Sequence, residues 1–186
     1  MQHKLIKTIV LVGMMGSGKT VIGRGLASKL KAKFLDLDQE IVYAANLEIT
    51  EIFENFGEKF FRQKESKVLE RLISGPPIVL ASGGGAFISE NNRKLILDQT
   101  ISIWLKTRPE ILWERLKNKT DRPLLNHCSS FSEFKMMYAV REKSYSRADI
   151  CVSNEGGLSI DDMIERTLSD YKSFIELKLD GKDYEA

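Results

Sequence analysis

Residues 13–20 read Gly-Met-Met-Gly-Ser-Gly-Lys-Thr and match the pattern G-x-x-x-x-G-K-[ST] at every fixed position. Glycines allow such a loop to wrap so that its backbone N–H groups point inward at phosphate oxygens. Lys19 is placed to reach the β- and γ-phosphates, and the Thr20 hydroxyl is placed to ligate Mg²⁺. An apolar run precedes the loop and an amphipathic pattern follows it, as this motif requires. The sequence therefore predicts a site for a nucleoside triphosphate with magnesium.

Two carboxylates end a second apolar run, in the stretch Phe34-Leu35-Asp36-Leu37-Asp38. Alternate residues of a strand point the same way, so we expect Asp36 and Asp38 on one face near the strand tip. Such a pair could serve magnesium and a hydroxyl-bearing acceptor. Alternatively, Asp38 only caps a following helix. Capping would explain Asp38 but not Asp36, which favours a functional pair.

A third apolar run leads directly into glycines, as Ile-Val-Leu-Ala-Ser-Gly-Gly-Gly over residues 78–85. Glycines pack nothing and cost conformational entropy, so they indicate either a flexible loop or a backbone that a ligand approaches closely. Many proteins with a phosphate loop place an acidic residue at the end of a later strand. This strand has Ser82 and the glycines there instead.

Three arginines lie where anion binding is plausible. Arg62 is flanked by aromatic residues, which is typical of a pocket wall with one charged tip. Arg122 lies in a proline-containing stretch between two predicted helices, where we expect a lid. Arg141 lies on a predicted helix that is otherwise apolar at Phe134, Met137 and Tyr138. Arginine binds carboxylates and phosphates in bidentate fashion. A single arginine is more often a solvated surface residue, and spacing alone does not assign each arginine to an anion.

The elements that position these residues follow from hydrophobic patterning. Five nearly continuous apolar runs predict strands at 8–12, 32–37, 77–81, 100–105 and 149–152. Helical patterns lie at 19–31, 38–45, after a cap at Thr50, and at 57–73, 89–97, 109–116, 131–146 and 159–177. Strand–helix alternation predicts one α/β domain over residues 1–186, built on a parallel sheet. Ligands of such sheets bind at the carboxyl ends of the strands, where the unusual residues collect.

Composition restricts the class of partner. With 28 basic and 26 acidic residues the net charge is +2, which argues against a nucleic-acid surface. The apolar content of 42% is that of a soluble globular protein, and no run reaches the ~18 apolar residues of a membrane span. Cys128 and Cys151 are too few for a disulfide framework, so we expect buried or incidental thiols. We expect a cytoplasmic monomer with no nucleic-acid or membrane partner.

Taken in chain order, the motifs resemble those of the shikimate kinase family. They are G-M-M-G-S-G-K-T-V-I-G-R, F-L-D-L-D, F-F-R-Q-K-E, S-G-G-G, D-R-P-L-L and R-E-K-S-Y, spread over about residues 8–152. The resemblance implies a P-loop fold of the nucleoside-monophosphate-kinase type, with a five-stranded parallel sheet, helices on both faces and a mobile lid at about 117–130. It implies transfer of the γ-phosphoryl group of ATP to the 3-hydroxyl of shikimate, which gives shikimate 3-phosphate for chorismate and aromatic amino-acid biosynthesis.

The resemblance also implies roles for residues on the nucleotide side. Lys19, Asp38 and Arg122 would be catalytic, with Arg122 carried by the lid. Thr20 would ligate Mg²⁺, and Asp36 would orient the metal's water shell. The expected ATP contacts are Gly16, Ser17, Gly18, Lys19, Thr20, Val21, Arg115, Arg122 and the backbone near Asn154.

On the acceptor side, the expected shikimate contacts are Asp38, Phe53, Phe61, Arg62, Gly83, Gly84, Gly85 and Arg141. Arg62 and Arg141 would clamp the carboxylate, with Glu65 holding Arg62 in place, and Gly84 would offer its N–H. The resemblance leaves open whether Asp38 removes a proton or only positions the hydroxyl. Ala81 departs from family members that have serine two residues before the first glycine, which leaves the outer magnesium shell open.

Two alternatives remain. One is another small-molecule kinase with a phosphate loop, for gluconate or a nucleoside monophosphate, which the products formed from several acceptors would separate. The other is a catalytically silent nucleotide-binding module, which would bind ATP without turning over any acceptor.

Overall fold

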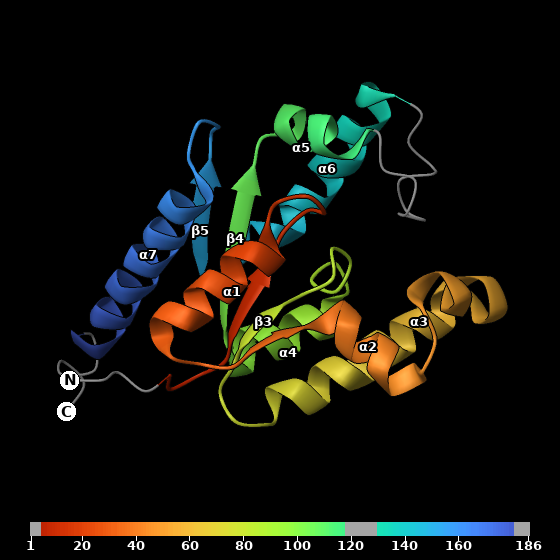
Figure 1. Cartoon of the computed structure of the whole chain (residues 1–186), viewed down its shortest axis with the longest axis horizontal. Coiled ribbons are helices and arrows are strands. Elements are labelled where there is room, and N and C mark those ends of the chain that lie inside the picture. The colour runs from red at the N-terminus through yellow and green to blue at the C-terminus, as the bar shows by residue number, and fades with distance from the viewer. Residues whose placement is uncertain (1–4, 118–129, 181–186) are drawn as a thin grey trace.

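Five parallel strands form one sheet in the order β2-β3-β1-β4-β5 (Figure 1). The computed structural model describes residues 5–117 and 130–180. Its strands are β1 Ile9–Val12, β2 Phe34–Asp36, β3 Val79–Ala81, β4 Ile101–Thr107 and β5 Ile150–Asn154. Its helices are α1 Lys19–Leu30, α2 Leu37–Ala45, α3 Ile49–Ile73, α4 Glu90–Gln99, α5 Pro109–Leu116, α6 Phe131–Tyr145 and α7 Ile160–Asp180. The predicted fold class is confirmed.

Each face of the sheet is covered by its own set of helices, because successive strand residues point to opposite sides. Ile9 and Leu11 of β1 pack into an apolar cluster with α1 and α7. Val10 and Val12 of the same strand pack into a second cluster with helices α2 to α6. Strands buried on both faces explain the unbroken apolar runs in the sequence.

The last helix packs closely against the first. A methyl group added at Gly25 of α1 would lie 2.8 Å from Cγ1 of Ile164 in α7 and closer still to its Cδ1. At the rim of this contact, Lys29 pairs with Glu165. The helix that follows the phosphate loop (residues 13–20) is therefore supported from outside by α7.

The strand order places the phosphate loop at a topological switch point. From β1 the chain crosses to β2 and returns through β3, whereas β4 and β5 lie on the other side of β1. Crevices form at the carboxyl ends of strands where the winding direction reverses. The loops after β1, β2 and β3 meet at this edge.

Element boundaries differ from the predictions in a few places. The helix predicted after a cap at Thr50 begins at Ile49, because Glu48 forms a reciprocal capping box with Glu51. It continues as α3 through a kink at Gly57, which has φ 75° and ψ 172°. Cys151 is exposed on β5, so of the two predicted kinds of thiol, buried or incidental, it is not the buried one.

Two predictions concern segments at the borders of the described residues. The lid predicted at about 117–130 and Arg122 within it lie outside the described residues, apart from Lys117 and Ser130 at its edges. Helix α7 extends to Asp180, so the tail predicted to fray from residue 178 begins as helix. Among the described residues, no helix combines the length and the apolar character needed to cross a membrane.

Candidate active site

The phosphate loop adopts the wrapped shape that its sequence predicts. Gly18 caps the N-terminus of α1 with φ 92°, a backbone conformation that suits glycine. Gly13 has φ 137°, and a methyl group added there would lie 2.9 Å from the carbonyl oxygen of Leu105. The Nζ of Lys19 donates to the carbonyl oxygens of Gly13 and Met14, each at 2.9 Å. The Lys19 ammonium group is therefore held by backbone carbonyls of the phosphate loop, beside the positive N-terminal end of α1.

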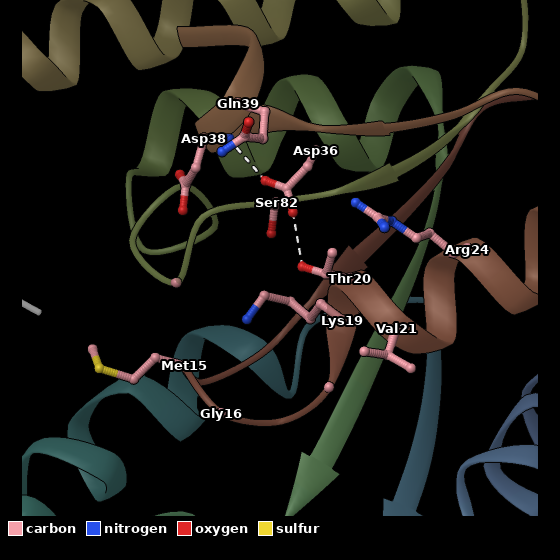
Figure 2. Close-up of a pocket in the computed structure, with 12 residues that line it drawn as sticks. Met15, Gly16, Lys19, Thr20, Val21, Arg24, Asp36, Asp38, Gln39 and Ser82 are labelled. Carbon is pink, nitrogen blue, oxygen red and sulfur yellow. Dashed lines mark hydrogen bonds between the residues drawn. The ribbon is translucent and has the colours of Figure 1, made fainter. Parts of the chain in front are cut away.

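Asp36 connects the phosphate loop to the end of β2. Its Oδ2 accepts from the Thr20 hydroxyl at 2.7 Å, and its Oδ1 accepts from the backbone N–H of Asp38 at 3.1 Å. In Figure 2 these contacts are the dashed lines above α1. Asp36, and not Asp38, is thus the N-cap of α2. Asp38 lies in the first turn of α2 and not on the strand, so the alternating-face prediction is wrong although both carboxylates reach one pocket.

That pocket has a volume of about 480 Å³. Its walls come from the phosphate loop, the start of α1, the β2–α2 junction and the segment after β3 (Figure 2). Predicted site residues that line it are Gly16, Gly18, Lys19, Thr20, Val21, Asp36, Asp38 and Gly84. Met15, Arg24, Gln39 and Ser82 line it as well and were not predicted. The signal for Arg24 was available, because it lies four residues after Thr20 and so on the same face of α1.

The glycine loop, Gly83–Gly85, fits between the pocket and the side chains of α2 and α3. A methyl group at Gly83 would lie 2.7 Å from Oδ1 of Asp38, and one at Gly84 would lie 3.5 Å from the backbone nitrogen of Met15. A methyl group at Gly85 would lie 2.8 Å from Cζ of Arg62 and closer still to Nη1. Gly83 and Gly85 are therefore needed for close approach, whereas a methyl group at Gly84 would make only an ordinary van der Waals contact.

Arg62 is held by two carboxylates of its own helix. Its Nη1 donates to Oε2 of Glu65 at 2.9 Å, and its Nη2 donates to Oε1 of Glu58 at 3.0 Å. Glu65 is 1% exposed, and burial raises its pKa although Arg62 opposes this effect. Oε1 of Glu65 is buried and has no hydrogen-bond partner among the described residues. The predicted contact between Glu65 and Arg62 is therefore present.

Aromatic rings and a second arginine are the other residues predicted to bind the acceptor. The rings of Phe53 and Phe61 lie 4.8 Å apart, and Arg62 stacks over Phe61 at 5.1 Å. Arg141 of α6 reaches the sulfur of Met14 in the phosphate loop at 3.9 Å. Within residues 5–117 and 130–180, Arg141 forms no ion pair. One guanidinium group, that of Arg62, thus lies against the glycine loop, and the other, that of Arg141, lies against the phosphate loop.

Arg115, Asn154 and Ser17 are residues predicted to contact ATP. Arg115 of α5 donates to the carbonyl oxygen of Gly16 at 2.9 Å, which places it against the phosphate loop. Asn154 ends β5 and accepts from the N–H of Gly156 at 3.0 Å. The Ser17 hydroxyl is buried and has no hydrogen-bond partner in the described chain.

The comparisons with known proteins point to one family. A family model described as shikimate kinase matches residues 15–172. A shikimate kinase of Ruegeria pomeroyi is 48% identical over 165 residues, which cover 89% of this chain and 85% of that protein. A shikimate kinase of Zymomonas mobilis is 47% identical and covers 78% of this chain and 83% of that protein.

Solved structures give the same result. The structure of a shikimate kinase from Acinetobacter baumannii in complex with shikimate has a TM-score of 0.85 and 34% identity, covering 91% of this chain and 95% of that one. A gluconokinase from Sinorhizobium meliloti covers 98% of this chain and 99% of its own, with a TM-score of 0.65 at 15% identity. That second likeness concerns the fold alone.

Proposed function

This chain belongs to the shikimate kinase family of ATP-dependent kinases, and we propose that it phosphorylates the 3-hydroxyl of shikimate at the pocket described above. One observation carries the proposal. The glycine loop lies between Asp38 and Arg62 at the edge of the phosphate pocket. A carboxylate that can bind hydroxyls and a guanidinium that can bind a carboxylate therefore both lie next to the site for the phosphoryl donor. A substrate with a carboxylate on one side of a ring and hydroxyls on the other matches this order of groups.

In the proposed reaction the 3-hydroxyl oxygen forms a bond to the γ-phosphorus while the bond to the β–γ bridging oxygen breaks. ADP and shikimate 3-phosphate result, and the hydroxyl proton is released. Alignment and charge neutralisation do most of the work in such transfers. Lys19 leaves its two loop carbonyls to bind the transferring phosphoryl group.

On the acceptor side, Asp38 binds the ring hydroxyls and Gly84 offers its N–H. Arg62 and Arg141 bind the carboxylate, since each guanidinium supplies the planar fork that a carboxylate accepts. Glu58 is 57% exposed, so releasing Arg62 from it costs little, whereas the buried Glu65 keeps Arg62 oriented. Phe53 and Phe61 pack against the ring.

Magnesium fits the nucleotide side of the pocket. Hard cations prefer oxygen ligands, and the Thr20 hydroxyl and the Asp36 carboxylate already meet there at 2.7 Å. Among the described residues, this pocket included, no cluster of three or more His, Cys, Asp or Glu side chains could hold a metal ion, so most of the ion's ligands would come from ATP and water. When bound with ATP, Mg²⁺ would neutralise phosphate charge. Thr20 would then hold the ion directly, with Asp36 acting through water.

The closing lid would add Arg122 over the phosphates and exclude water, the competing nucleophile. Residues 117–130 are proposed for that role from the sequence. We therefore expect weak ATP hydrolysis without an acceptor. The expected monomeric state and cytoplasmic location stay predictions, and gel filtration tests the first.

A coupled assay of ADP release tests the proposed function. The enzyme is given Mg-ATP with shikimate, gluconate, AMP or no acceptor. Strong stimulation by shikimate alone supports the proposal. Stimulation by gluconate or AMP instead would assign another kinase, and ATP binding without turnover of any acceptor would indicate a silent nucleotide-binding module.

A further inference from the structure

The glycine loop needs contacts from outside to keep one shape. Three successive glycines restrict their backbone angles less than any other tripeptide. Each carbonyl oxygen of the loop nevertheless accepts a hydrogen bond. Gly83 accepts from the N–H of Ala86 at 3.2 Å, and Gly85 accepts from the N–H of Ile88 at 3.0 Å. These two bonds belong to the local turn and would form in any chain that bends there.

The middle carbonyl is bound differently. Gly84 accepts from the hydroxyl of Tyr145, at 2.5 Å, across 61 positions of sequence. Tyr145 is 1% exposed and lies at the end of α6, with its ring stacked on Trp104 at 6.2 Å between centroids. Burial raises the pKa of Tyr145 to about 12, so the hydroxyl keeps its proton and remains a donor at neutral pH.

Tyr145 also lies on the same helix face as one of the anion-binding arginines. Arg141 precedes it by four residues in α6, one helical turn. That arginine contacts Met14 of the phosphate loop, while Gly84 lies against Met15 of the same loop. Helix α6, the glycine loop and the phosphate loop therefore converge, and the Tyr145 hydroxyl joins two of them.

We infer that Tyr145 is a positioning residue for the acceptor, because its hydroxyl fixes the Gly84 peptide at a set distance from Arg141. This inference rests on the proposed function. Without the hydroxyl, the middle carbonyl of the loop loses its partner, and the Gly84–Gly85 peptide plane, which carries the Gly85 N–H, loses its fixed direction. The neighbouring Gly84 N–H is then held only by a flexible glycine backbone. The phosphate loop keeps its own bonds, from Ser17 N–H to Met14 and from Ile22 N–H to Gly18. The loss should thus fall on shikimate and not on ATP.

Tyr145→Phe tests the inference, because it keeps the ring and its packing and removes only the donor. We expect the KM for shikimate and its dissociation constant by calorimetry to rise about tenfold, the size of one lost hydrogen bond with an orphaned acceptor. We expect kcat to fall less than threefold and the KM for ATP to change less than twofold. Tyr138→Phe is the matched control, since Tyr138 is a second buried tyrosine of α6, 6% exposed.

The outcomes separate the two proposals. If Tyr145→Phe behaves as Tyr138→Phe does, or raises both KM values equally while lowering Tm, Tyr145 only fills the core and the inference is wrong. If the wild-type enzyme gives no shikimate-dependent ADP release, the proposed function fails, and the assignment of Tyr145 fails with it. A selective rise in the KM for shikimate in an active enzyme supports both.

Discussion

Replacing Gly85 by alanine would displace the Arg62 side chain while leaving the arginine itself unchanged. The added methyl group would lie 2.8 Å from Cζ and Nη2 of Arg62 and closer still to Nη1. Gly85 does not have a left-handed backbone, so alanine adds no backbone strain there. The effect of the substitution is therefore confined to the guanidinium, which must move away from the loop.

The size of the effect follows from these distances. Non-bonded heavy atoms lie about 3.5 Å apart at their optimal separation, so the Arg62 guanidinium must move away from the added methyl group by roughly 1 Å. A retreat of that size breaks the 2.9 Å hydrogen bond from Arg62 to Glu65 or misplaces the arginine for a substrate carboxylate. A charge-assisted hydrogen bond contributes about 1.5–3 kcal/mol. We therefore expect kcat/KM for shikimate to fall about 10- to 150-fold.

Steady-state kinetics with shikimate and ATP varied in turn measures this loss. Gly75→Ala is the matched control, because its methyl group would meet only the carbonyl oxygen of Leu72 at 3.4 Å and that of Arg71 at 3.8 Å. The KM for ATP should change less than twofold in both variants. A Gly85→Ala enzyme whose kcat/KM for shikimate stays within twofold of the control would refute the coupling between the glycine loop and Arg62.

Three further predictions concern the carboxylates and the lid. Burial raises the pKa of Glu65 above 4.5, so the folded state holds its proton more tightly and gains stability as pH falls. In urea unfolding, the free energy of unfolding of the wild type should rise relative to that of Glu65→Gln as the pH is lowered from about 7 to about 4.5. A difference between the two proteins that stays constant with pH would contradict this. Asp36→Asn keeps an oxygen to cap α2, so Tm should change little while half-maximal activity requires about tenfold more Mg²⁺; an unchanged magnesium titration would exclude Asp36 from the metal site. Arg122→Ala should lower kcat about 100-fold or more, with the dissociation constant of shikimate changed less than threefold; an unchanged kcat would count against the lid role.

Much of the fold could be predicted because its signals are local. Each strand is an apolar run that begins and ends within a few residues of the prediction, and the phosphate loop carries its own motif. The loop context also predicted that Lys19, Thr20, Asp36 and Asp38 would share an edge, which the pocket confirms. The prediction that Asp36 and Asp38 lie on one face of a strand was wrong. The strand ends one residue earlier than predicted, and Asp36 takes the capping role that was considered for Asp38.

One contact that sequence reasoning missed is local. Thr50 is a better intrinsic cap than glutamate, yet Glu48 is the N-cap of α3 because Glu51 returns the hydrogen bond. The other missed contact joins distant segments. Tyr145 belongs to the quoted stretch R-E-K-S-Y, but nothing in that stretch indicates Gly84, which lies 61 positions earlier. Only the docking of α6 against the sheet edge brings the two together.

The packing of α7 on α1 affects how the nucleotide site is made in the cell. The ribosome releases α1 long before α7, and the interval is on the order of ten seconds at ordinary synthesis rates. During that time Gly25, Leu26 and their apolar neighbours have no Ile164 to pack against. The nascent helix that carries Lys19 and Thr20 therefore exposes an apolar surface of the kind that chaperones bind. The nucleotide site is synthesised early, but the helix that packs behind it is among the last elements to be made.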